Sequence, residues 1–167
     1  TLHGLVTARL DTLDAADRDT IEDCAVIGST GPVDAVTALV TARHGTEPAS
    51  SLDRLADREL LELDNGEFRF PSEVVRDVAY GQTARGDRAR RHRSAATWLE
   101  GKAGERVEDL AEVLAHHYLQ ALELTEAVGN GNADGELGVS ARRYLALAGE
   151  MLATDPELAV HMRVFLY

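Results

Sequence analysis

The decapeptide LELDNGEFRF, residues 61–70, constrains the fold more than any other stretch of this chain. Asn65 and Gly66 at its centre indicate a two-residue β-hairpin turn, because both residues tolerate the positive φ angles of a type I′ turn. Pairing across that turn places apolar residues on one face and an opposite-charge pair on the other: Leu63 with Phe68, Leu61 with Phe70, and Glu62 with Arg69. We therefore expect a short hairpin with one buried face.

A helix is predicted directly after the hairpin. Pro71 cannot donate a ladder hydrogen bond, so the strand should end there. Ser72 is a suitable N-cap for a helix over residues 73–83. The apolar side of this helix would consist of Val74, Val75, Val78 and Ala79.

Four more helices are predicted before the hairpin, because apolar residues recur there at helical spacing. They cover residues 2–13, 15–27, 33–43 and 51–60. Asp14 and Ser50 are the expected N-caps of the second and fourth helices, Gly45 is the expected stop of the third, and residues 29–32 break the chain between helices. Three helices followed by a two-stranded wing are typical of a winged-helix domain, here about residues 14–70.

After residue 84 only helices are predicted, over residues 85–101, 105–127, 139–154 and 156–167. The glycine-rich segment 128–138 is expected to be a loop. The expected fold class is mainly α, with three parts. Residues 1–13 form a connecting helix, residues 14–83 a winged-helix domain with its exit helix, and residues 84–167 an antiparallel helical region that leads into a tetratricopeptide-like (TPR-like) array.

Charge and cysteine content narrow the classes of partner and compartment. The net charge is −12, and residues 1–83 contribute −9 of it. Such acidity disfavours general attraction to nucleic acid or to an anionic membrane. Cys24 is the only cysteine, and the sequence has neither a signal peptide nor an apolar run of membrane-spanning length, so the cytoplasm is favoured. The missing first methionine and the apolar last residues lead us to expect a piece of a larger polypeptide.

DNA binding is the alternative that a winged helix raises. The expected recognition segment, residues 51–64, carries two arginines against five carboxylates, net −3, which a phosphate backbone would repel. Residues 85–93 carry a net charge of +4, but their arginines spread around the helix and form no stripe. We interpret them as a solvated surface that forms salt bridges between domains, with Arg88 beside the alanine face.

The sequence patterns of enzymes and metal sites are not found. No G-x-x-x-x-G-K-[ST] or G-x-S-x-G motif occurs, so neither a phosphate-binding loop nor a nucleophile elbow is expected. His116 and His117 are adjacent on a helix and point about 100° apart, which argues against a shared metal ion. His92 lies on the side of its helix that carries Ala95, and we expect it to make a structural hydrogen bond. The sequence predicts no catalytic residue and no metal.

Two blocks of the sequence resemble a known family. EFRFPSEVVRDVAYGQTARGDRARRHRSAATWLE and DLAEVLAHHYLQALEL are similar to the region just after the nucleotide-binding core in bacterial signal-transduction ATPases with numerous domains. That family, the STAND-type regulators, includes proteins fused to adenylate or guanylate cyclase domains and LuxR-type transcriptional activators. The resemblance implies a P-loop ATPase that binds ATP or ADP before residue 1, and a helical-repeat sensor after residue 167.

One position departs from the family pattern. The resemblance implies a histidine two residues after the second phenylalanine of the wing, where it would touch the β-phosphate of bound ADP; this chain has Ser72 there. An N-cap is the simpler role for this serine. With the backbone amides of Glu73 and Val74 it would offer a phosphate only a weak contact at a helix N-terminus. The resemblance therefore implies loose, not tight, ADP locking.

The function expected from the sequence is regulatory and not catalytic. The chain would couple the nucleotide state of the upstream ATPase domain to the helical repeats that follow it, through contacts between protein domains. The side chains expected at these contacts are Arg76, Asp77, Tyr80, Arg88 and His92. A DNA-binding winged-helix regulator and a helical-repeat scaffold that binds protein are the alternatives.

Overall fold

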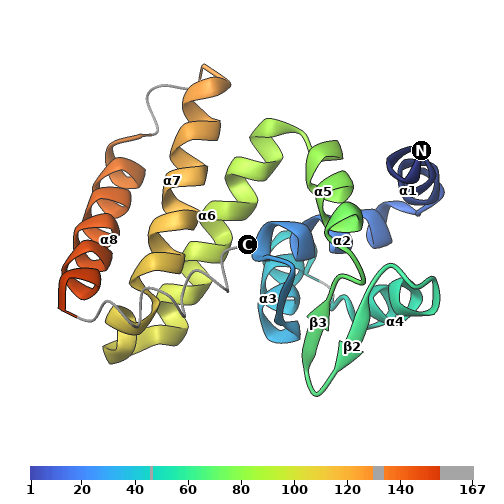
Figure 1. The fold of residues 1–167 in the computed structure, drawn as a ribbon, viewed down its shortest axis with the longest axis horizontal. Coiled ribbons are helices and arrows are strands. Elements are labelled where there is room, and N and C mark those ends of the chain that lie inside the picture. The colour runs from blue at the N-terminus through green and yellow to red at the C-terminus, as the bar shows by residue number, and fades with distance from the viewer. Residues whose placement is uncertain (46, 130–133, 155–167) are drawn as a thin grey trace. The chain divides into compact units, whose positions relative to one another are not determined.

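The computed structural model describes residues 1–45, 47–129 and 134–154. The fold is mainly helical with one small antiparallel sheet, and the chain divides into two compact units, Thr1–Ala84 and Arg85–Tyr167 (Figure 1). Within the described ranges, no helix combines the length and the apolarity that crossing a membrane requires. The helix expected over residues 156–167 lies outside the described residues.

The first unit is built around helix α2 (Ala15–Ile27), which contacts α3, α4 and α5. Asp14 is its N-cap as predicted, because its Oδ1 accepts a hydrogen bond from the backbone N–H of Asp17 at 2.8 Å. Ile21, Cys24 and Ala25 are buried, as the helical spacing indicated. Burial raises the pKa of the Cys24 thiol well above its usual value.

Helix α1 (Leu2–Asp11) also packs in the first unit, mainly on α5 (Glu73–Gln82). Val6 and Leu10 are buried in the core. Leu2 and Leu5, the other two leucines of α1, are each 61% exposed. Only the later turns of α1 therefore contribute to the packing.

The sheet contains a strand that the sequence analysis missed. Residues Thr30–Pro32, expected to be only a break, form β1, which pairs antiparallel with β3 (Glu67–Arg69) and gives the sheet order β1-β3-β2. Gly31 lies opposite Phe68, and a Cβ atom there would approach Ile27 Cγ2 to 2.6 Å. Backbone pairing explains the strand, since three residues with a glycine and a proline carry little β-strand pattern of their own.

The predicted hairpin is confirmed. Strand β2 (Glu62–Asp64) pairs with β3 in the expected register, with Leu63 opposite Phe68 and Glu62 opposite Arg69, and Asn65 and Gly66 have positive φ angles. Phe68 and Phe70 are buried with their rings in a T-shaped arrangement 6.2 Å apart. Leu63 is 37% exposed, so the buried face does not extend to the tip of the hairpin.

Helix α3 (Val33–His44) ends at Gly45, whose φ of 71° confirms the predicted stop.

The prediction for α4 (Ala49–Asp57) was wrong at both ends. Pro48, not Ser50, occupies the N-cap position, and the helix ends before Leu60 because the chain turns at Glu59, where φ is 56°. The backbone N–H groups of Leu60 and Leu61 then both donate to the carbonyl oxygen of Leu55.

The second unit places three helices side by side, with α7 (Ala111–Ala127) between α6 (Arg85–Ala103) and α8 (Asp134–Thr154), and neighbours run antiparallel (Figure 1). The long helix predicted over 105–127 is wrong at its start, because Gly104–Leu110 forms a 3₁₀ segment, η1, that begins at a glycine with a φ of 51°. The predicted loop 128–138 is too long, since α8 already begins at Asp134.

The core of the second unit is organised by one carboxylate. Glu100 on α6 accepts hydrogen bonds from Tyr118 of α7, at 2.5 Å, and from Tyr144 of α8. The two tyrosine rings are stacked with centroids 5.7 Å apart and planes 3° apart. Burial and the Glu100 carboxylate together raise the pKa of Tyr144 to about 12. Glu100 thereby connects all three helices.

Candidate functional site

The N-terminus of α5 carries the residues expected to contact a nucleotide phosphate. Ser72 occupies the N-cap position, but its side chain makes no capping hydrogen bond, so that part of the prediction was wrong. Glu73 Oε2 accepts a hydrogen bond from Ser29 Oγ at 3.0 Å, and Val74 packs against the first core. A carboxylate in the first turn already complements the positive end of the helix.

Arg76, Asp77 and Tyr80 form a small polar group on the next turns of α5. Arg76 Nε donates to the carbonyl oxygen of Ala25 on α2 at 3.3 Å, and the Arg76 guanidinium lies 5.9 Å from the centre of the Tyr80 ring. Asp77 is exposed, with its Oδ1 3.6 Å from Arg76 NH1. The Arg76 hydrogen bond anchors α5 to α2 inside the first unit, and the Asp77 carboxylate stays exposed beside Arg76.

Two buried carboxylates of α2 hold arginines from the neighbouring helices. Asp17 is 1% exposed, and both of its oxygens accept hydrogen bonds at 3.0 Å from Arg54 Nε of α4. Asp23 is 0% exposed and accepts from Arg43 of α3 at 3.2 Å. The hydrogen bond to Asp17 raises the pKa of Arg54, which is one of the two arginines of the expected recognition segment. That arginine is therefore committed to an internal ion pair.

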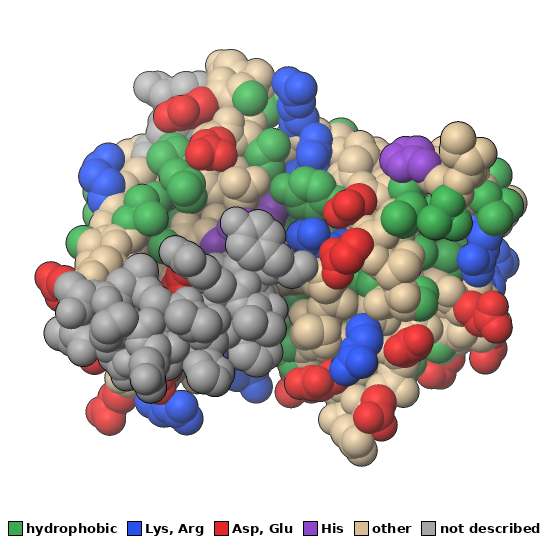
Figure 2. Space-filling view, viewed as in Figure 1, with side chains coloured by type: hydrophobic (Ala, Val, Ile, Leu, Met, Phe, Trp, Pro, Cys, Tyr) green, Lys and Arg blue, Asp and Glu red, His purple; other side chains and the backbone are tan. Residues whose placement is uncertain are grey.

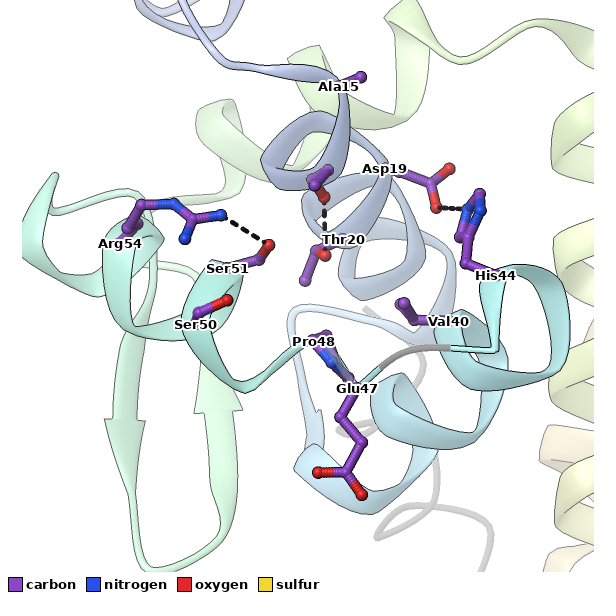
Figure 3. Close-up of a pocket in the computed structure, with 11 residues that line it drawn as sticks. Ala15, Asp19, Thr20, Val40, His44, Glu47, Pro48, Ser50, Ser51 and Arg54 are labelled. Carbon is purple, nitrogen blue, oxygen red and sulfur yellow. Dashed lines mark hydrogen bonds and ion pairs between the residues drawn. The ribbon is translucent and has the colours of Figure 1, made fainter.

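A cleft of about 460 Å³ opens between α2, α3 and α4 (Figure 3). On one side His44 Nε2 lies 2.7 Å from Asp19 Oδ2, and on the other side Ser51 Oγ accepts a hydrogen bond from Arg54 at 3.0 Å. Ser50 and Ser51 lie across the cleft from His44, so the histidine and carboxylate are not aligned with a serine for nucleophilic catalysis.

The second unit brings three histidines together on facing helices. His92 of α6 is buried, and its Nδ1 lies 2.9 Å from Nδ1 of the buried His117 on α7. His116 is half-buried, and its ring centre lies 5.8 Å from that of His92 and 5.3 Å from that of His117. One ring nitrogen from each of the three residues lies within 4.8 Å of the other two. Arg88, one turn before His92, is half-buried.

Of the two sequence predictions about histidine, the structure agrees with one and disagrees with the reasoning behind the other. The structural hydrogen bond expected of His92 is present, with His117 as its partner. The argument that His116 and His117 point too far apart to share a ligand was wrong, because the two ring centres are only 5.3 Å apart. An angle of about 100° at the helix axis does not separate long side chains that approach a common neighbour on another helix.

The electrostatics of the cluster favour a neutral imidazole at His117. Burial, and then the neighbouring His116, lower the pKa of His117 from 6.5 to about 3. At neutral pH the His117 ring is therefore uncharged and has one nitrogen lone pair available. The only sequence signal for the cluster was the dipeptide His116-His117, since the pairing of α6 with α7 that adds His92 is not readable from local spacing.

Comparisons with protein-family models, with curated proteins and with solved structures found no match to this chain.

Proposed function

We propose that this chain is a non-catalytic regulatory part of a multidomain signal-transduction ATPase or transcriptional regulator of the STAND type. In this proposal it couples the nucleotide state of an upstream ATPase domain to a helical-repeat sensor by contacts between protein domains. The ATP or ADP is bound by the upstream domain, and this chain supplies neither a phosphate-binding loop nor a catalytic group.

The order of elements in the first unit supports a winged helix. Helix α2 is followed by strand β1, helices α3 and α4, and the hairpin β2-β3, and the central strand of the sheet is β3. A helix-turn-helix pair followed by a wing has this order. The antiparallel α6, α7 and α8 support a TPR-like second half in the same way.

The charge of the α4 and hairpin surface is the observation that carries the proposal. Its exposed carboxylates are Asp53, Asp57, Glu59, Glu62, Asp64 and Glu67, and they outnumber its exposed arginines, Arg58 and Arg69, by six to two. Arg54, on the same helix, is held by Asp17. On the face drawn in Figure 2, the described basic side chains of the first unit do not join into a patch. This surface would repel a phosphate backbone and suits a cationic protein surface.

Helix α5 is the element that we propose transmits changes between the upstream ATPase domain and the helical-repeat sensor. Arg76 attaches the helix to α2, so a force on α5 is transmitted to the centre of the first unit. Asp77 and Tyr80 remain at the surface or half-buried on the same helix, where they would contact a neighbouring domain. Arg88, which is half-buried, would have the corresponding role on α6, whereas the interdomain role expected of His92 does not fit its burial against His117.

The direct test adds this chain to the ATPase domain encoded upstream of it and measures ATP turnover as the chain concentration rises. A saturable change in turnover that weakens with salt is expected, because charged surfaces are screened. Charge reversal of the hairpin, Glu62→Lys with Asp64→Lys and Glu67→Lys, should abolish that change. The matched control reverses three exposed carboxylates of the second unit: Glu105→Lys, Glu108→Lys and Glu126→Lys.

Two outcomes would replace the proposal by an alternative. Retardation of duplex DNA at low salt by the wild-type chain, lost on reversal of charge in the exposed Arg58 or Arg69, would favour a DNA-binding regulator. Unchanged ATP turnover at saturating concentrations, together with binding to other protein partners, would favour a passive helical-repeat scaffold.

A further inference from the structure

We propose that His92, His116 and His117 form a binding site for one divalent transition-metal ion, with Zn²⁺ as the ion that the donor set fits best. This inference is independent of the regulatory function proposed above. It uses only side chains of α6 and α7, within the second unit.

The donor atoms are close to the spacing that zinc requires. Zinc binds histidine nitrogens at about 2.0–2.1 Å in tetrahedral sites, which places two such nitrogens about 3.3 Å apart. His92 Nδ1 and His117 Nδ1 are 2.9 Å apart. The widest separation in the set is 4.8 Å, which a rotation of the half-buried His116 side chain can shorten.

The protonation of the rings is compatible with binding. Two neutral imidazoles that face each other through Nδ1 share a single hydrogen between those atoms. A metal ion between them takes both Nδ1 lone pairs, and the hydrogen that leaves one Nδ1 is carried on Nε2 of the same ring in the other tautomer.

A second observation points to the same place. Glu112 lies one turn before His116 on α7, and residues four apart share a face of a helix. Its Oε2 atom is buried and has no hydrogen-bond partner. A buried carboxylate oxygen without a partner is costly, and a cation nearby would compensate it. We assign Glu112 as the outer carboxylate of the site, either as fourth ligand or as a hydrogen-bond acceptor for a ligand ring.

The bound ion would add a second connection between α6 and α7, beside the one that Glu100 makes to Tyr118, the residue that follows His117. Three histidines leave one coordination position for a carboxylate or a water molecule. Imidazole donors also suit Co²⁺, Ni²⁺ and Cu²⁺, which makes Co²⁺ a usable optical probe.

The test uses the whole chain after dialysis against a chelator. Isothermal titration with Zn²⁺ should give one equivalent per chain, and Co²⁺ should give the visible absorption bands of tetrahedral coordination. His116→Gln should abolish the Co²⁺ bands and weaken Zn²⁺ binding by more than 100-fold. Glu112→Gln should weaken Zn²⁺ binding by about 10–100-fold. His3→Gln is the matched control, because His3 is exposed and lies in the first unit, and it should bind as the wild type does.

Thermal unfolding supplies an independent readout. Zn²⁺ at about 100 times its dissociation constant should raise the melting temperature of the second unit in the wild type and in His3→Gln, and should leave His116→Gln unchanged. Circular dichroism without metal shows whether each variant is folded. Absence of saturable Zn²⁺ binding, or undiminished binding and undiminished Co²⁺ bands in folded His116→Gln, would overturn the proposal and leave the cluster as a structural hydrogen bond only.

Discussion

Replacement of Glu100 by glutamine should destabilise the second unit more than any other conservative change at a half-buried polar side chain. In the wild type, one carboxylate accepts hydrogen bonds from two tyrosine hydroxyls, Tyr118 and Tyr144. Glutamine keeps one acceptor oxygen and loses the charge. One hydroxyl then keeps a neutral hydrogen bond in place of a charged one, a loss of about 1 kcal/mol, and the other is left without its acceptor, a loss of about 1–3 kcal/mol.

The expected loss is therefore about 2–4 kcal/mol for Glu100→Gln. For a unit of this size, 1 kcal/mol corresponds to a shift in melting temperature of about 4–8 °C, so the unit should melt roughly 8–32 °C lower. Differential scanning calorimetry and urea unfolding monitored by the fluorescence of Trp98, the single tryptophan of the sequence, both measure this change. Glu126→Gln, an exposed carboxylate on α7, is the control and should change stability by less than about 0.5 kcal/mol.

A double-mutant cycle separates the two contacts. Tyr118→Phe and Tyr144→Phe each remove one hydroxyl and keep the stacked ring. Each should cost less in the Glu100→Gln background than in the wild type, because the partner of the hydroxyl is already altered. Additive costs in this cycle, or a Glu100→Gln melting temperature within about 2 °C of the wild type, would refute the idea that Glu100 organises this core.

Three further predictions concern other parts of the chain. Gly31→Ala should destabilise the first unit by about 1–3 kcal/mol, because its Cβ would lie 3.0 Å from the ring of Phe68. Gly81→Ala is the control, and it should stabilise the unit by about 0.5–1 kcal/mol, because Gly81 is in a helix with open space around it. Equal effects of the two substitutions in chemical unfolding would contradict this. The pKa of Tyr144 is raised from 10 to about 12 in the folded chain, so the unfolded chain releases this proton first. Stability that is complete below pH 10 should therefore decline between pH 10 and about pH 12. Urea unfolding across that range tests the sign of the change, and a flat profile would refute it. Ser72→His in the intact regulator should slow ADP release by about tenfold, the equivalent of one charge-assisted hydrogen bond, and an unchanged off-rate measured with a fluorescent nucleotide would count against a phosphate contact at this position.

Local patterns predicted the elements that depend on local chemistry. The Asn65-Gly66 turn, the Asp14 cap and the Gly45 stop are all present, because each is determined by a preferred backbone angle or a hydrogen bond within a few residues. Strand β1 was missed because its pairing partner, β3, lies far along the chain, with Gly31 opposite Phe68. The end of α4 was misplaced because Leu60 looks like a continuation of the apolar stripe, although the chain leaves the helix at Glu59.

In the candidate site too, local sequence predicted some features and missed those that depend on contacts between helices. Burial of the His92 side of α6 followed from the alanines on that side, as at Ala95 and Ala96. The assembly of His92 with His116 and His117 did not follow, because it needs the register of α6 against α7, and that register is set by packing around Glu100 and Tyr118. The buried oxygen of Glu112 was equally invisible, since a glutamate in the first turn of a helix is normally an exposed one.

The burial of Cys24 has a practical consequence for any study of motion in this chain. Its thiol is 0% exposed and its pKa is raised, so alkylating reagents should not modify it while α2 stays packed. Because it is the only cysteine, its rate of modification reports how often the first unit opens, with no engineered label. The fluorescence of Trp98, the single tryptophan of the sequence, follows the second unit. The natural sequence therefore carries two separate probes, one for each unit, and a signal that passes between them can be timed by comparing the two.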